Sequence, residues 1–268
     1  MTGEGEDLIG SRDWPELVRR VRARTPARLL QGRAGAAYRT QTQIELRKAH
    51  AAARDAVRAE LDLERDFDAA FIRRWKLFEV STQAASKDEY LLRPDLGRCF
   101  SEAARAELTK RCSHDNDLQI VIGDGLSVTA VSKQVPSLLE LLQAQADERG
   151  WKTGEPFAVR HCRVGILNEI GVVLTPRVVI LLIGERPGLA TAESLSAYLA
   201  YRPQPGHTDA NRNLISNIHS RGVNTLDAAS RITDFAEKMM TTGTSGYRLR
   251  EEFPVPVNTE IMCPCKLL

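Results

Sequence analysis

An unbroken run of six aliphatic residues, Val178 to Ile183, constrains the fold of this chain more than any other segment. A run of this length, rich in β-branched residues, predicts a strand buried on both faces, as in the centre of a parallel sheet. The Gly-Glu-Arg-Pro-Gly segment at 184–188 then forms the loop at the carboxyl end of that strand. Because open α/β sheets bind ligands at this edge, Glu185 and Arg186 are candidate binding residues. The alternative is a solvated turn that carries a surface ion pair.

Strand and helix patterns alternate through the second half of the chain. A tight loop, Gly123 to Ser127, follows the first predicted strand, and Gly150 closes the helix after it. Strands joined by helical crossovers favour βαβ units, so we expect an α/β fold with a doubly wound, mostly parallel sheet. Besides the central strand, we predict strands at 118–122, 157–161 and 196–202 and helices at 136–149, 165–174 and 225–240. The helical spacing in the last of these predicts a core stripe of Leu226, Ala229, Ile232, Phe235 and Met239.

The N-terminal part of the chain is predicted to be mostly helical. Helical patterns begin at Asp13 and at Thr40, and a third one covers 67–78. Residues 90–95 read as a short extended piece ended by a proline, and a helix follows to about Cys112. We therefore divide the chain into a helical N-terminal region, residues 1–95, and an α/β domain, residues 96–268.

An aromatic stripe in the 67–78 pattern is the clearest core signal of the N-terminal region. Aromatic residues spaced by three or four positions lie on one face of a helix and usually pack against a neighbouring helix. The residues of this stripe are Phe67, Phe71, Trp75 and Phe78.

Composition excludes several classes of function. Thirty-seven basic and 35 acidic residues give a net charge of +2, which implies no nucleic-acid partner. The longest apolar run is far below the roughly 18 residues of a membrane span, and the acidic first residues do not resemble a signal peptide. Five cysteines, an odd number at no framework spacing, suit a reducing compartment. We therefore expect a cytoplasmic protein with no membrane partner.

Three motifs are too weak to assign chemistry. Gly123-Asp124-Gly125 resembles a dinucleotide fingerprint, but its third glycine would fall at Val128, so an NAD-dependent oxidoreductase is only a distant alternative. Cys263-Pro264-Cys265 has no second pair at metal-ligand spacing, so we predict no metal site. No Ser, Cys or Lys lies in a nucleophile motif, and we predict no catalytic residues in this chain.

Taken together, the motifs resemble one family, the small (light) chain of the adenosylcobalamin-dependent enzyme ethanolamine ammonia-lyase. The matching motifs occur in order over residues 30–240. They are Gly32-Arg33-Ala34-Gly35, the segment 50–57, Leu92 to Arg98, Val121 to Ser127, Val178 to Gly188, Glu193 to Ser196, and Ile215 to His219.

The resemblance implies a subunit and not a complete enzyme. In this family the large chain is a barrel with the substrate site, and the small chain supplies a Rossmann-like domain that holds the corrinoid against the barrel. The enzyme converts ethanolamine to acetaldehyde and ammonia, in a complex with equal numbers of large and small chains. Residence in a bacterial microcompartment is a further property that the resemblance raises and the sequence leaves open. The family's cobalamin contacts fall on Val164, Glu185 and Leu214, the last standing where the family pattern has Cys.

His219 lies in a segment that differs by one residue from a histidine box of other cobalamin enzymes. That box, D-x-H-x-x-G, replaces the nucleotide base of the cofactor by a histidine ligand, but here Asn217 stands in place of the Asp that orients the imidazole. Fewer than fifty residues follow His219, too few for the domain that such a box opens. We interpret His219 as structural or interfacial.

A non-catalytic scaffold that pairs with a barrel enzyme is the alternative from another class. A ligand site requires Val164, Glu185 and the Gly123-Asp124-Gly125 loop to share one edge of the sheet, whereas a scaffold does not.

Overall fold

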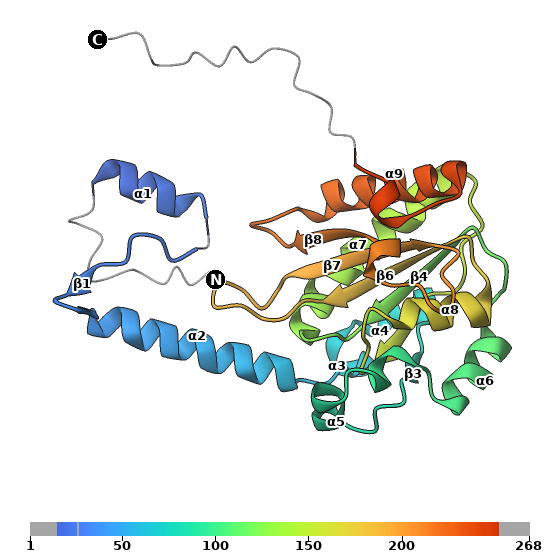
Figure 1. Ribbon diagram of the computed structural model, residues 1–268, viewed down its shortest axis with the longest axis horizontal. Coiled ribbons are helices and arrows are strands. Elements are labelled where there is room, and N and C mark those ends of the chain that lie inside the picture. The colour runs from blue at the N-terminus through green and yellow to red at the C-terminus, as the bar shows by residue number, and fades with distance from the viewer. Residues whose placement is uncertain (1–14, 26, 252–268) are drawn as a thin grey trace, which may run out of the picture.

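The computed structural model describes residues 15–25 and 27–251, and it is a mixed α/β structure built around a six-stranded sheet (Figure 1). The strand order is β3-β5-β4-β6-β7-β8. The pairs from β3 to β6 are parallel, whereas β7 and β8 run antiparallel to their neighbours. The sheet is therefore mixed, with a parallel half and an antiparallel half. The strands are β3 (Glu79–Ser81), β4 (Leu118–Gly123), β5 (Phe157–Arg160), β6 (Val178–Gly184), β7 (Leu195–Tyr201) and β8 (Asn213–Ile218).

The aliphatic run forms the predicted central strand. All seven residues of β6 are buried, and the strand lies between β4 and β7. Ile180 faces Ile120 of β4 on one side and Leu199 of β7 on the other. A strand with neighbours and covering helices on both faces has no solvated side, which is why its sequence shows no polar alternation.

Helices cover both faces of the sheet and divide the core into two clusters (Figure 1). The first face packs against α7 (Val128–Glu148) and α9 (Thr225–Thr242), together with α4 (Ala69–Trp75). The second face packs against α6 (Glu102–Arg111) and α8 (Ile166–Leu174).

The N-terminal residues form an arm that extends from this body (Figure 1). It consists of α1 (Glu16–Ala23), a two-stranded hairpin of β1 (Arg33–Ala34) and β2 (Ala37–Tyr38), and α2 (Thr40–Arg58). Neither α1 nor the hairpin has a buried residue, and α2 has only Thr42. The short helix α3 (Leu63–Asp66) then leads into the body, where α5 (Lys87–Leu92) follows β3.

Three sequence predictions on helices are wrong. Residues 90–92 belong to α5, whose N-cap Ser86 accepts a hydrogen bond from the Glu89 backbone N–H at 3.2 Å, and not to an extended piece. Helix α7 begins at Val128 instead of Pro136 and keeps the proline inside. Burial of the apolar face of this helix offsets the roughly 3 kcal/mol that an interior proline costs. In α9, Leu226 is 59% exposed although its spacing placed it in the core stripe.

The aromatic stripe is split between the two faces of the sheet. Phe67 stacks on Phe71, with ring centroids 5.3 Å apart, and Phe71 contacts Trp75 at 6.2 Å. Phe78 lies beyond the end of α4 and packs on Phe157 in the other cluster, at 5.8 Å. The helix ends at Lys76, whose φ of 47° turns the chain, so Phe78 does not continue the stripe.

Two strands of the six-stranded sheet escape the sequence prediction. Short, partly exposed strands give weak patterns, and both β3 and β8 lie at the edges of the sheet. Strand β3 comes from the region predicted to be helical and pairs Val80 with Val159. Within the described residues, no helix is long and apolar enough to cross a membrane.

Candidate functional site

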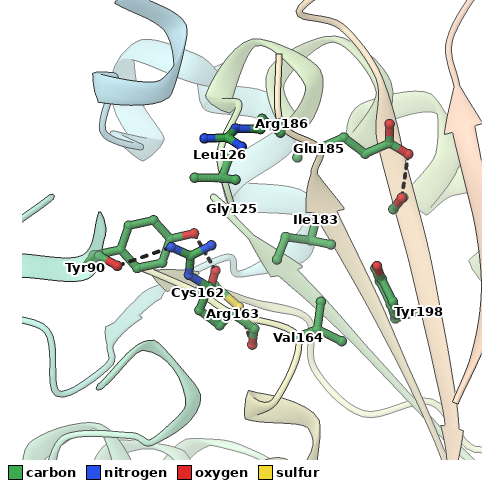
Figure 2. A pocket seen from close by; sticks show the side chains of 12 residues that line it. Tyr90, Gly125, Leu126, Cys162, Arg163, Val164, Ile183, Glu185, Arg186 and Tyr198 are labelled. Atoms are coloured by element: carbon green, nitrogen blue, oxygen red, sulfur yellow. Dashed lines mark hydrogen bonds between the residues drawn. The ribbon is translucent and has the colours of Figure 1, made fainter. Parts of the chain in front are cut away.

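A cavity of about 200 Å³ opens at the edge of the sheet where β4, β5 and β6 end (Figure 2). The loop after each of these parallel strands contributes to its wall, and β7 adds side chains because it starts at the same edge. Carboxyl ends of parallel strands meet at one edge, which is how residues distant in sequence converge here. The lining residues are Tyr90, Gly125, Leu126, Cys162, Arg163, Val164, Ile183, Gly184, Glu185, Arg186, Ser196 and Tyr198.

Two of the three residues that the family resemblance indicated meet in this cavity. Val164 follows β5 and Glu185 follows β6, and both line this cavity together with Gly125 of the loop after β4. Close packing of these loops needs glycine, since a Cβ on Gly125 would lie 2.3 Å from the Gly184 carbonyl oxygen, and Gly125 has a φ of 56°. The arrangement that a ligand site requires and a scaffold does not is therefore present.

Leu214, the third of these residues, lies one strand further along. It belongs to β8 and is paired with Tyr198 of β7, whose side chain lines the cavity. Directly paired residues of antiparallel strands point to the same face of the sheet. Leu214 is 45% exposed and does not itself line the cavity. It extends the same surface beyond Tyr198.

The Glu185 carboxylate ties three strands together at the edge of the cavity. Its Oε1 accepts hydrogen bonds from the Ser196 hydroxyl at 2.5 Å and the Asn217 backbone N–H at 2.9 Å. Its Oε2 accepts one from the Ser194 hydroxyl at 2.6 Å. A carboxylate oxygen has two lone pairs, so Oε2 retains one acceptor position for a ligand. Glu185 is thus both a brace between β6, β7 and β8 and a possible ligand acceptor.

A buried aspartate fixes the loop that carries Val164. Asp124 is fully buried and accepts hydrogen bonds from the backbone N–H groups of His161 at 3.0 Å and Cys162 at 2.8 Å. The Lys87 ammonium, also buried, lies 3.4 Å from the same carboxylate and donates to the Gly125 carbonyl oxygen at 3.1 Å. These contacts join the loop after β4 to the loop after β5. They also pair the buried carboxylate of Asp124 with the buried ammonium of Lys87, because a buried charge without an opposite charge is strongly destabilising.

Tyr90 and Arg163 form the wall of the cavity next to α5 (Figure 2). The Arg163 guanidinium lies over the Tyr90 ring, 4.1 Å from its centroid, and donates to the Tyr90 carbonyl oxygen at 3.2 Å. The Tyr90 hydroxyl donates to the Cys162 carbonyl oxygen at 3.0 Å. Burial raises the pKa values of the Tyr90 hydroxyl and of the Cys162 thiol, so both groups are neutral at physiological pH.

A second cavity, of about 540 Å³, adjoins the first and shares Arg163, Val164 and Tyr198 with it. Arg98 and Arg212 add two more guanidinium groups to its wall. Arg212 donates to Asp209 at 2.5 Å and to Asn168 at 3.2 Å, and burial lowers the pKa of its side chain. The two cavities together form a long site with mixed polar and apolar walls, in which the arginines of the second cavity lie beside Glu169 and Asp209.

His219 is committed to a structural role, as the sequence indicated. It is 3% exposed, its Nδ1 accepts from the Arg221 backbone N–H at 3.2 Å, and its Nε2 lies 2.8 Å from Asn217 Oδ1. Because Nδ1 accepts, Nε2 must carry the proton that is donated to Asn217. Neither ring nitrogen is available to a metal.

Sequence reasoning missed several of the cavity residues. Tyr90 and Arg163, which line the cavity, and Lys87, which is buried against Asp124, carry no motif of their own, and they meet only because α5 packs against the loop after β5. The described residues contain no group of three or more His, Cys, Asp or Glu side chains placed to hold a metal ion. Cys263-Pro264-Cys265 lies outside the described residues.

Comparison with known proteins shows the family of this chain. A family model described as ethanolamine ammonia-lyase light chain (EutC) matches residues 15–250. The ethanolamine ammonia-lyase small subunit of Clostridium perfringens is 40% identical over 230 residues, which cover 86% of this chain and 76% of that protein. The small subunit of Clostridium acetobutylicum is 39% identical over 235 residues, covering 88% and 95% respectively.

Proposed function

The chain belongs to the ethanolamine ammonia-lyase light chain family, and we propose that it holds adenosylcobalamin against a large subunit of that enzyme, which carries the substrate site. In this proposal the two kinds of chain assemble in equal numbers and convert ethanolamine to acetaldehyde and ammonia. The small chain binds and orients the cofactor and supplies no catalytic residue.

One observation carries the proposal. Val164, Glu185 and Gly125 come from three different loops and line one cavity at the ligand-binding edge of the sheet. A scaffold would need only an outer surface, whereas a preformed cavity with convergent polar groups is typical of a small-molecule site.

The residues present fit a corrinoid with amide side chains. Leu126, Val164 and Ile183 give the cavity apolar walls, which suit the ring of such a cofactor. The remaining acceptor position on Glu185 Oε2 suits an amide N–H, and the Arg163 and Arg186 guanidinium groups suit amide carbonyl oxygens. When bound, the cofactor supplies the radical chemistry of the reaction, while the protein supplies binding and orientation.

The hydrogen bonds that hold the loops around the cavity support a role in binding and orienting the cofactor. Asp124 holds the backbone of the loop that presents Val164, and Glu185 holds β7 and β8 beside it. In this proposal residues 96–268 supply most of the Rossmann-like, cobalamin-contacting domain, the N-terminal region adds β3 and Tyr90 to it, and the arm contributes contacts with the large subunit. Leu214 contributes through its backbone or by packing, at the margin of the site.

The test is reconstitution with the large subunit. Each chain alone is expected to lack ammonia-lyase activity, and the mixture is expected to be active only when adenosylcobalamin is added. Cofactor binding is followed separately, by retention of the cobalamin absorbance with the complex after gel filtration. Retention that does not depend on the small chain would favour the scaffold alternative, and an active small chain alone would contradict the proposal.

A further inference from the structure

The basic residues of this chain are concentrated in the N-terminal arm. Residues 15–58 contain eleven Arg and Lys against three Asp and Glu, a net charge of +8. The whole chain carries only +2, so the remaining residues have a net charge of −6. A near-neutral total thus hides a basic arm attached to an acidic remainder, which is a stronger electrostatic signal than the total charge gives.

A groove between α2 and the loop after β6 concentrates part of this charge. It has a volume of about 410 Å³, and the Arg28 guanidinium beside it donates a hydrogen bond to the Leu189 carbonyl oxygen. The groove has both apolar and basic side chains on its walls. We call it the α2 groove, and it is lined by Leu46, Arg47, His50, Ala51, Arg54 and Leu189.

The cations of the α2 groove have no acidic partner in the part of the chain that the structure describes. Arg47 and Arg54 are exposed, and neither forms an ion pair with a described residue. By contrast, Arg58 at the end of the same helix pairs with Asp88 at 2.9 Å. Leu189 on the opposite wall is 45% exposed. Unpaired cations around exposed apolar side chains are typical of a surface that another macromolecule covers.

The position of the groove indicates which macromolecule that is. The loop of residues 185–194 begins with Glu185 and Arg186, which line the first cavity, and continues to Leu189, which lines the groove. The same short loop therefore separates the two. A chain that closes the cavity over a bound cofactor must pass next to the α2 groove.

We propose that the α2 groove is the docking site for an acidic segment of the large subunit. Carboxylates of that segment pair with Arg47 and Arg54, and its apolar side chains contact Leu46 and Leu189. The inference rests on the proposed function, because it takes the large subunit to be the chain that covers the cavity. A nucleic acid is a poorer fit, since the groove has apolar walls and the rest of this chain carries negative charge that repels phosphates.

The experiment measures association of the small and large chains as a function of salt concentration. The variant is Arg47→Gln together with Arg54→Gln, which removes two exposed charges and no buried contact. Removing charges at the margin of an interface mainly slows association and reduces its dependence on salt. The association rate constant in 50 mM NaCl is expected to fall by about fivefold to tenfold, with the difference largely lost at 500 mM.

A matched control separates specific docking from a general effect of charge. Lys110→Gln with Lys152→Gln removes the same charge from exposed positions outside the arm, and its association rate constant is expected to stay within about twofold of the wild type. Equal effects of the two double variants would overturn the α2 groove as a docking site. The docking site would also be overturned if the Arg47→Gln, Arg54→Gln variant (the arm variant) associates with an unchanged rate constant. Normal assembly and activity of that variant would leave the proposed function intact.

Two further measurements test other occupants of the groove. If the isolated small chain self-associates through the arm, light scattering will show a dimer that the arm variant loses. If nucleic acid occupies the groove, the purified chain will carry absorbance at 260 nm that the arm variant lacks. Either result, combined with unchanged association with the large chain, contradicts the inference.

Discussion

The Cys162 backbone N–H donates a 2.8 Å hydrogen bond to Asp124 Oδ1, and this bond fixes the end of β5 against the loop after β4. The same carboxylate accepts from His161, whose φ of 57° lies in the left-handed region. A residue other than glycine needs support from its surroundings to remain there. Asp124 gives that support from the core.

Replacement of Asp124 by Asn should therefore loosen the site and destabilise the fold. Asn has one acceptor oxygen, so one of the two backbone N–H groups is left without a partner, and Lys87 loses its counter-charge. Breaking one side of a buried pair costs about 3–5 kcal/mol. Thermal unfolding of the assembled enzyme measures the loss. Because Lys87→Met removes the buried charge that Asp124→Asn leaves unpaired, the double variant should be less destabilised than the single one, and a more unstable double variant would contradict this account.

Replacement of Glu185 by Ala should weaken cofactor binding. It removes the ligand acceptor and also releases Ser194, Ser196 and the Asn217 backbone N–H. We expect a loss of about 1–3 kcal/mol in the binding free energy of adenosylcobalamin to the reconstituted enzyme. The control is Glu193→Ala in the same loop, whose carboxylate pairs with Lys133 at the surface. If Glu185→Ala and Glu193→Ala bind adenosylcobalamin with the same affinity, Glu185 is an ordinary turn residue and does not bind the cofactor.

Replacement of Leu214 by Cys should change cofactor affinity by less than about 1 kcal/mol, because a thiol here exchanges one apolar contact for another. Leu214→Pro should cost clearly more, since it removes a backbone N–H and restricts φ. Equilibrium titration of the reconstituted enzyme with the cofactor distinguishes the two. A large gain in affinity from Leu214→Cys would show that the side chain at this position binds the cofactor through its sulfur.

The stability of the chain should fall in alkaline solution because of its buried thiols. Burial raises the pKa of Cys112 to about 12 and that of Cys162 well above 9.0. Thiols of the unfolded chain lose their protons near pH 8.5, so above that pH the folded state binds more protons than the unfolded state. The free energy of unfolding should then fall by about 1.4 kcal/mol per pH unit for each thiol.

Urea unfolding of the assembled enzyme at pH 7.5 and pH 10 measures this loss. The two thiols together should lower the free energy of unfolding by about 4 kcal/mol between these values. Cys112→Ala should remove about half of the decrease. A pH dependence that is the same in this variant and in the wild type would assign the alkaline loss to other groups.

The three inner parallel strands were predictable because burial on both faces leaves a direct trace in the sequence, whereas the parallel edge strand β3 was not. The strands β4, β5 and β6 and the helices α8 and α9 occur close to the predicted positions. The antiparallel direction of β7 and the pairing of β8 were not predictable from these patterns. Local sequence gives the existence of a strand, whereas its direction depends on which neighbour it pairs with after the chain has collapsed.

The residues of the candidate site also include some that the sequence could predict and some that it could not. Glu185 could be placed because it follows the central strand, and the carboxyl ends of parallel strands share an edge, whereas Val164 was indicated only by the family resemblance. Tyr90 could not be placed, because it reaches the cavity only through the packing of α5, and the same packing brings Lys87 to Asp124. The basic arm was also hidden, since the total charge of the chain averages it with an acidic remainder.

The antiparallel return of β7 makes the segment between β6 and β7 a hairpin that is closed at both ends. Gly184 pairs with Leu195 at its base, the Glu185 backbone N–H donates to the Ser194 carbonyl oxygen at 3.0 Å, and Gly188 donates to Thr191 at its tip at 3.1 Å. Closing a longer loop on a fixed base costs only about 0.6 kcal/mol for each doubling of its length. This tip can therefore accept a reporter group without loss of the sheet. A fluorophore on a Gly188→Cys variant would lie between the cavity and the arm, where it could register arrival of the large subunit and of the cofactor as separate events in time.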